Sequence, residues 1–77
     1  MFTTARLSID NFRTSVRLTG DTWKPGDPSD RFDVVWVGAN DWRPAADAEL
    51  AGRGYRRTGA WVRDDNPTEY IAPIAAN

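Results

Sequence analysis

The stretch ARLSIDNFRTSVRLT, residues 5–19, alternates polar and apolar residues on both sides of Asp10–Asn11. A helix would also place some of these apolar residues on one face, but the unbroken alternation and the Thr, Ser and Val content favour strands. We predict a β-hairpin with a two-residue loop at Asp10–Asn11, which sets Leu7 opposite Thr14. The apolar residues of both strands then share one face.

The other face of this hairpin is polar and basic. It would present Arg6, Ser8, Arg13, Ser15 and Arg17. Three guanidinium groups on one exposed face could hold phosphate or carboxylate groups. A plainly solvated surface is the alternative.

The next segments are a loop and a strand. GDTWKPGDPSD, residues 20–30, is dense in Gly, Pro, Asp and Ser and predicts a long loop. Residues 32–38, FDVVWVG, predict a strand that is apolar on both faces near its middle. That pattern is typical of a central strand covered on two sides.

PAADAELA, residues 44–51, is the one segment that predicts a helix. Asn40 or Asp41 can cap its start, Pro44 suits an early helical position, and Gly52 or Gly54 can end it. The helix is short and its apolar residues are small, so it can cover one sheet face only thinly.

Two more strands are expected after the helix. Residues 54–63, GYRRTGAWVR, predict a strand with a bulge at Gly59. Residues 69–74, EYIAPI, predict a final strand at a sheet edge, because Pro73 cannot donate to a ladder.

The resulting order is β-β-β-α-β-β within a single domain, residues 1–77. It predicts an α+β fold with a small, mostly antiparallel five-stranded sheet and one short helix. A small OB-like barrel shares this order and is the alternative.

Composition limits the chemistry. The chain has no Cys and no His, which excludes disulfides, the commonest zinc sites and nucleophiles activated by histidine. Asp27, Asp30 and Asp33 lack the spacing of a calcium loop. We therefore expect no enzymatic activity, no cofactor and no metal.

The sequence also predicts the cellular location of the protein. Its longest apolar run is residues 34–37, far below the roughly 20 residues that span a bilayer. No signal peptide is recognisable at the start. We expect a cytoplasmic protein without a membrane partner.

The charge is unevenly distributed around a net value of −1. Residues 1–20 and 51–77 are mildly basic, whereas residues 21–50 carry six Asp and one Glu against three basic residues. Such a dipolar surface can steer a charged partner. Abundant Asp in loops is the simpler explanation.

Four tryptophans are many for 77 residues. Trp36 and Trp61 lie in apolar strand patterns and are expected in the core. Trp23 and Trp42 lie in polar, turn-forming contexts. Each could fold over the sheet, Trp42 as a lid at the helix start, or lie exposed beside the acidic residues, where tryptophan is typical of interface hot spots.

We therefore expect a non-catalytic protein-binding module whose partner has a basic surface. The candidate binding residues are Trp23, Asp27, Asp30, Asp41, Trp42, Asp47 and Glu49. In size, lack of catalytic groups and Asp-rich loops, the chain resembles the small phage inhibitors of host defence, including anti-CRISPR proteins. That resemblance implies an inhibitor that covers the nucleic-acid-binding surface of a larger bacterial complex, such as a CRISPR effector.

Two other partners remain open. An OB-like nucleic-acid-binding domain could use the arginine-rich strand, with Arg53, Tyr55, Arg56, Arg57 and Trp61. A homodimer is the second alternative, because one thin helix cannot cover both faces of the sheet.

Overall fold

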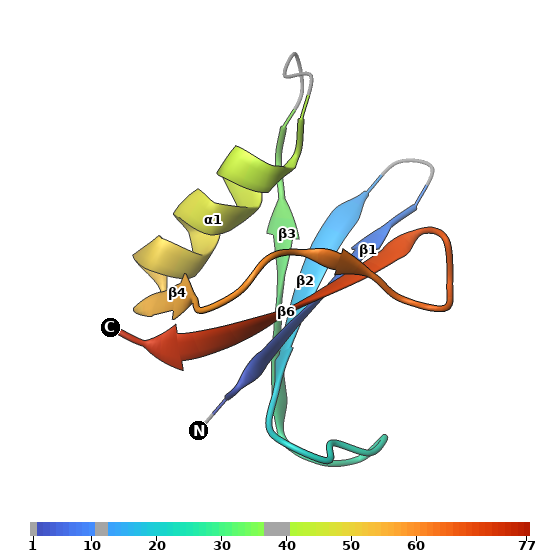
Figure 1. Cartoon of the computed structure of the whole chain (residues 1–77), viewed down its shortest axis with the longest axis vertical. Coiled ribbons are helices and arrows are strands. Elements are labelled where there is room, and N and C mark those ends of the chain that lie inside the picture. Colours follow the sequence, from blue (N-terminus) through green and yellow to red (C-terminus); the bar gives the residue numbers. More distant parts are fainter. Residues whose placement is uncertain (1, 11–12, 37–40) are drawn as a thin grey trace.

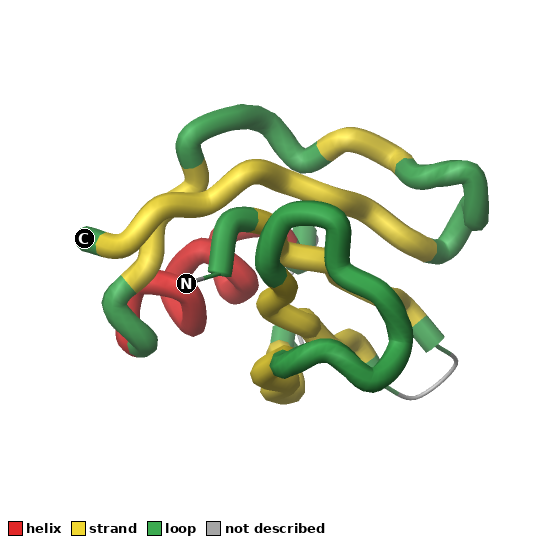
Figure 2. Tube along the Cα trace, turned by 90° about the horizontal axis from the view of Figure 1, so that it is seen from below, coloured by secondary structure: helices red, strands yellow, loops and turns green. Residues whose placement is uncertain are grey.

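The computed structural model describes residues 2–10, 13–36 and 41–77. Its elements are β1 (Thr4–Ile9), β2 (Thr14–Thr19), β3 (Ser29–Val34), α1 (Arg43–Gly52), β4 (Tyr55–Arg57), β5 (Val62–Arg63) and β6 (Glu69–Ala76). The strands form an antiparallel sheet in the order β3-β2-β1-β6-β4, and β5 also pairs with β6. The sheet curls into a half-barrel beside α1 (Figures 1 and 2). The predicted α+β class, with its mostly antiparallel sheet and one short helix, is confirmed.

The core lies between the inner face of the sheet and α1. Alternate strand residues enter it, because side chains of a strand point to opposite faces with a period of two. The helix adds Ala46 and Leu50, which are four residues apart and so share one helical face. The buried apolar residues are Ala5, Leu7, Val16, Leu18, Phe32, Val34, Trp42, Ala46, Leu50, Ala72 and Ile74.

The β1–β2 hairpin is confirmed, but its predicted register is wrong. Leu7 lies opposite Val16 rather than Thr14. The observed pairing is shifted by two residues, so every side chain keeps its predicted face. Asp10 N–H bonds to the Arg13 carbonyl at 2.7 Å, which closes a longer loop than predicted. Asn11, part of the predicted turn, lies outside the described residues.

β3 begins earlier than predicted, at Ser29, and ends at Val34. The prediction that it is covered on both sides is wrong: β3 ends the strand order, and Val35 is 78% exposed. The physical reason is that its outward positions hold Arg31 and Asp33, which favour water over a second apolar layer. Residues 37–40 lie outside the description.

The predicted helix is confirmed and is slightly longer at both ends, Arg43–Gly52. Asp41 Oδ1 accepts a hydrogen bond from the Arg43 N–H at 3.0 Å and satisfies one of the free donors of the first turn. Gly54, with φ of +89°, terminates the helix and donates to the Ala51 carbonyl at 3.1 Å. Asn40, the other predicted cap, lies outside the described residues.

The strand predicted over residues 54–63 is divided into β4 and β5, which both pair with β6. The prediction that β6 is an edge strand is wrong, because β1 pairs along its other side. Pro73 is tolerated there because of the division. The Pro73 carbonyl accepts from the Thr58 N–H at 2.9 Å and therefore points toward β4 and β5. In an antiparallel strand the N–H of a residue points to the same side as its carbonyl, so the N–H that Pro73 lacks would face the interruption between β4 and β5.

In the described part of the chain the sheet stays open, with β3 and β4 at its two ends and α1 packed against both. The sheet shares its curl with the alternative OB-like barrel, but among the described residues no pairing joins β3 to β4. Among the same residues, no helix is both long and apolar enough to cross a membrane.

Candidate binding surface

Trp23 and Asp27 order the loop between β2 and β3. The Trp23 indole Nε1–H donates to the Asp27 carbonyl at 3.2 Å. The Asp27 carboxylate accepts from the Lys24 N–H at 2.9 Å, and Asp27 N–H donates to the Lys24 carbonyl at 3.0 Å. The Trp23 ring is half-buried and packs on Arg17, whose guanidinium carbon lies 5.4 Å from the ring centroid. The loop is thus held by its own contacts and by the sheet.

The acidic groups of this loop face solvent. Asp27 and Asp30 are exposed, and their carboxylates accept backbone N–H bonds rather than pairing with a cation among the described residues. Asp21 accepts from the Thr3 hydroxyl at 2.8 Å. The loop therefore offers negative charge that the rest of the described fold does not neutralise.

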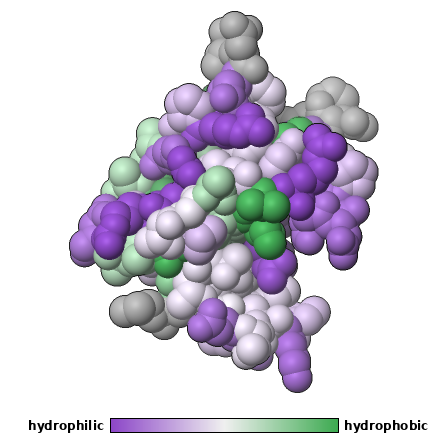
Figure 3. Space-filling view, viewed as in Figure 1, coloured by the Kyte–Doolittle hydropathy of each residue, from purple (hydrophilic) through white to green (hydrophobic). Residues whose placement is uncertain are grey.

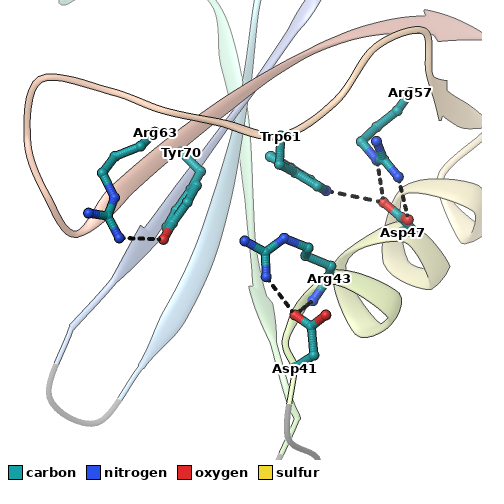
Figure 4. A network of polar contacts seen from close by, with 7 residues as sticks. All are labelled: Asp41, Arg43, Asp47, Arg57, Trp61, Arg63 and Tyr70. Atoms are coloured by element: carbon teal, nitrogen blue, oxygen red, sulfur yellow. Dashed lines mark hydrogen bonds and ion pairs between the residues drawn. The ribbon is translucent and has the colours of Figure 1, made fainter.

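The remaining acidic candidates lie elsewhere. The 20–28 loop is at one end of the sheet, and the start of α1 is at the other (Figure 1). Asp41 precedes α1, and Asp47 and Glu49 lie on it. The seven predicted site residues therefore do not form one surface. Trp23 and Asp27 are joined by a hydrogen bond, and Asp30 follows three residues later on β3. Asp41 and Asp47 form a separate group near the start of α1, close enough for their charges to interact (Figure 4).

Asp47 is already paired within the molecule (Figure 4). Arg57 binds both of its carboxylate oxygens, and Trp61 Nε1–H donates to Oδ1 at 3.3 Å. The hydrogen bond from Arg57 is the main cause of a lowered pKa at Asp47, and the Trp61 bond adds to it against the opposing effect of burial. The same pair raises the pKa of Arg57. This arrangement joins α1 to β4 and leaves Asp47 little capacity for a partner.

Asp41 is similarly occupied. Its Oδ1 accepts from both the backbone N–H and the Nη1 of Arg43, each at 3.0 Å. The backbone bond is the largest cause of its lowered pKa. Glu49 is exposed on α1, apart from the loop.

Of the two alternatives for Trp42, exposure beside the acidic residues is wrong, because the side chain is buried. Only 6% of it is exposed. Its ring meets Trp61 edge-on at 5.4 Å between centroids and Tyr70 at 4.9 Å, and Arg43 covers it at 4.7 Å. Trp42 is the lid at the helix start. Its polar sequence neighbours concealed this, because the aromatic residues that contact it, Trp61 just before β5 and Tyr70 on β6, are distant in the sequence.

The arginine-rich strand is also used internally. Arg57 pairs with Asp47, Arg56 Nη1 donates to the Ala76 carbonyl at 2.9 Å, and Arg53 covers Phe32 at 4.1 Å. Trp61 packs on Trp42, as expected for a core residue. On this strand the guanidinium groups therefore already make contacts within the molecule, although Arg53 and Arg56 remain exposed.

Arg31 belongs to a basic surface that the sequence indicated only in part. It lies beside Arg17, which lies beside Arg6, on neighbouring strands. The alternation of residues 5–19 placed Arg6 and Arg17 on one face. Arg31 was missed because the segment before residue 32 read as the end of a loop.

In comparisons with known proteins, no family model, no curated protein and no solved structure matches the chain.

Proposed function

We propose that this chain is a non-catalytic protein-binding module that inhibits a larger bacterial complex in the cytoplasm. It covers a basic, nucleic-acid-binding surface of that complex, such as a CRISPR effector. The observation that supports this most is the ordered 20–28 loop followed by Asp30, with exposed carboxylates and a half-buried tryptophan at its base. Carboxylates presented in this way can occupy positions that phosphates would take on the partner.

The loop is suited to binding because it is already ordered. Its Trp23–Asp27 and Lys24–Asp27 hydrogen bonds hold the free chain in one conformation. A preordered loop loses less conformational entropy on association than a flexible one does. The partner would then be recognised through the negative charge of the Asp27 and Asp30 carboxylates.

The surface in Figure 3 agrees with recognition through polar groups. Hydrophilic side chains dominate the face drawn, and hydrophobic surface appears in small separate areas. Across the described residues, the exposed large hydrophobic side chains are Val35 and Val62. An extended apolar patch, which marks many obligate interfaces, is not offered on that face.

The test is an affinity capture from a nuclease-treated bacterial lysate with the tagged protein as bait. We expect a discrete protein to be retained by the wild type and lost with Asp27→Lys/Asp30→Lys. The milder Asp27→Asn/Asp30→Asn variant keeps an oxygen acceptor for the loop bonds and should weaken capture by removing charge alone.

The matched control is Asp33→Lys/Asp65→Lys, which changes the net charge equally at two exposed sites outside the loop and outside the candidate residues. It should retain the partner. The purified partner should also lose nucleic-acid binding when the wild-type protein is added. Capture that disappears with nuclease treatment would contradict the proposal. So would an equal loss of capture by Asp27→Lys/Asp30→Lys and by the control variant.

A further inference from the structure

A row of three arginines crosses the outer face of the sheet. Arg6 on β1 lies opposite Arg17 on β2, and Arg17 lies opposite Arg31 on β3. Strands are spaced by about 4.8 Å, so the row extends over roughly 10 Å of surface. The next outward row consists of the opposed pair Ser8 and Ser15 with a carboxylate at each end, Glu69 beside Ser8 and Asp33 beside Ser15.

The positive charge of this row is not neutralised by the described fold. Like charges directly opposite each other on neighbouring strands destabilise a sheet. Arg31 Nη2 lies 3.4 Å from the Ser15 hydroxyl, and Arg17 packs on Trp23. Among the described residues, no ion pair joins any of the three to a carboxylate. By contrast, Arg43 and Arg57 each have a carboxylate within 3.0 Å.

The row lies in a groove. One hollow of about 330 Å³ is lined by Arg6, Ser8, Ser15, Arg17, Trp23, Arg31, Asp64, Glu69, Tyr70 and Ile71. A second of about 320 Å³ is lined by Ser8, Asp10, Arg13, Ser15 and Arg31. Because the two hollows share Ser8, Ser15 and Arg31, they adjoin. They form a track from Trp23 past the arginine row to Arg13, whose Nε lies 3.8 Å from an Asp33 carboxylate oxygen.

We propose that this track binds single-stranded nucleic acid. A track with several cationic groups in sequence suits a chain of regularly repeated phosphates better than it suits a single small anion. Guanidinium groups bind phosphate oxygens through two parallel N–H donors, and serine hydroxyls commonly contact the same backbone. Stacking on Trp23 uses the face of the Arg17 guanidinium and leaves its N–H donors free.

The aromatic ring distinguishes nucleic acid from an acidic peptide. Basic groups that follow a backbone, combined with an aromatic side chain on which bases stack, are the usual features of single-strand binding. Trp23 supplies that ring at one end of the track. Asp64 and Glu69 border the side next to β6 and would direct a phosphate chain toward β2 and β3.

The experiment measures the affinity of the purified protein for a fluorescent oligothymidylate of about 12 nucleotides, long enough for the usual single-strand sites. Without base readout, we expect a dissociation constant of about 10⁻⁴ to 10⁻⁶ M that tightens at low salt. Each phosphate neutralised on a single strand adds about −0.7 to the slope of log K against log salt, so three arginines give about −2.

Arg6→Gln/Arg31→Gln should weaken binding roughly tenfold at low salt and reduce the slope to about −0.7. The matched control, Arg53→Gln/Arg56→Gln, removes two exposed arginines from the α1–β4 side and should leave both values unchanged. Thermal unfolding of the track variant should occur at the same or a higher temperature, because the change relieves repulsion between like charges.

Absence of wild-type binding at low salt, or equal losses in both variants, would overturn the proposal. So would a polyglutamate peptide that binds as tightly as the oligonucleotide, since the track would then favour an acidic protein. This inference is independent of the proposed inhibitor function. The oligonucleotide assay contains no protein partner, and Asp27→Asn/Asp30→Asn should not weaken it.

Discussion

Arg57 donates two hydrogen bonds to Asp47, from Nε to Oδ1 at 2.7 Å and from Nη2 to Oδ2 at 2.9 Å. This fork joins the middle of α1 to β4, and Arg57 also donates from Nη1 to the Gly59 carbonyl at 2.9 Å. In a domain of this size, with one thin helix over its sheet, such a link between elements matters for stability.

Asp47→Asn should therefore lower stability. The Arg57 and Asp47 side chains are 29% and 41% exposed, so solvent screening limits the effect. We expect a loss of about 1 kcal/mol, which corresponds to about 4–8 °C in Tm for a domain of this length. Thermal unfolding followed by circular dichroism measures it. Asp65→Asn is the control, and identical melting of the two variants would contradict the role of the pair.

The same pair makes stability depend on pH. The pKa of Asp47 is lowered from its ordinary value of 3.8, mainly by the Arg57 hydrogen bond. A carboxyl with a lowered folded-state pKa stabilises fully above its unfolded pKa, and the contribution is lost as pH falls through the folded value. The stability difference between wild type and Asp47→Asn should thus be largest at neutral pH and shrink below about pH 4. Urea unfolding across this range tests it, and a difference that grows in acid would contradict it.

Trp42 and Trp23 should respond differently to the same change. Trp42 is 6% exposed and contacts Trp61 and Tyr70, so Trp42→Phe leaves a void and should cost about 1–3 kcal/mol. Trp23 is half-buried over Arg17, so Trp23→Phe should cost less than about 1 kcal/mol. Urea unfolding of both variants provides the comparison. An equal loss of unfolding free energy in the two variants would contradict the greater burial of Trp42.

Gly59 should not tolerate a side chain. A Cβ there would lie 2.8 Å from Pro73 Cγ, closer than such atoms approach. Gly59→Ala should lose about 1–3 kcal/mol through overpacking between the β4–β5 connection and β6. Gly52→Ala, at a helical position with no atom within 4 Å, is the control and should be neutral or stabilising. A Gly59→Ala protein as stable as the wild type would contradict the close packing.

Local pattern was sufficient for the elements and for the face of each strand residue. The alternation around Leu7 and Val16 predicted which side chains are buried, and it remained correct although the register is shifted by two residues. The prolines and glycines around α1 predicted its bounds within one residue. Both features depend on residues close together in the chain.

Contacts between distant residues were not predictable in this way. Pro73 indicated an edge strand, yet β6 is paired on both sides because the interruption between β4 and β5 removes the need for its N–H. The acidic residues of segment 21–50 looked like one surface. Arg43 and Arg57 occupy two of them, and the sheet separates the loop from the helix.

The sequence by itself determined the fold class, the helix, the two-sided character of the hairpin and the absence of cysteine and histidine chemistry. These follow from residue type and from short-range periodicity. Only the tertiary structure decided that Trp42 is buried and that Arg31 completes the row begun by Arg6 and Arg17. It also decided that, among the described residues, Asp47 forms an ion pair whereas Asp27 and Asp30 form none. The physical reason is that burial and charge pairing are set by which strands become neighbours, and that choice depends on the packing of the whole sheet.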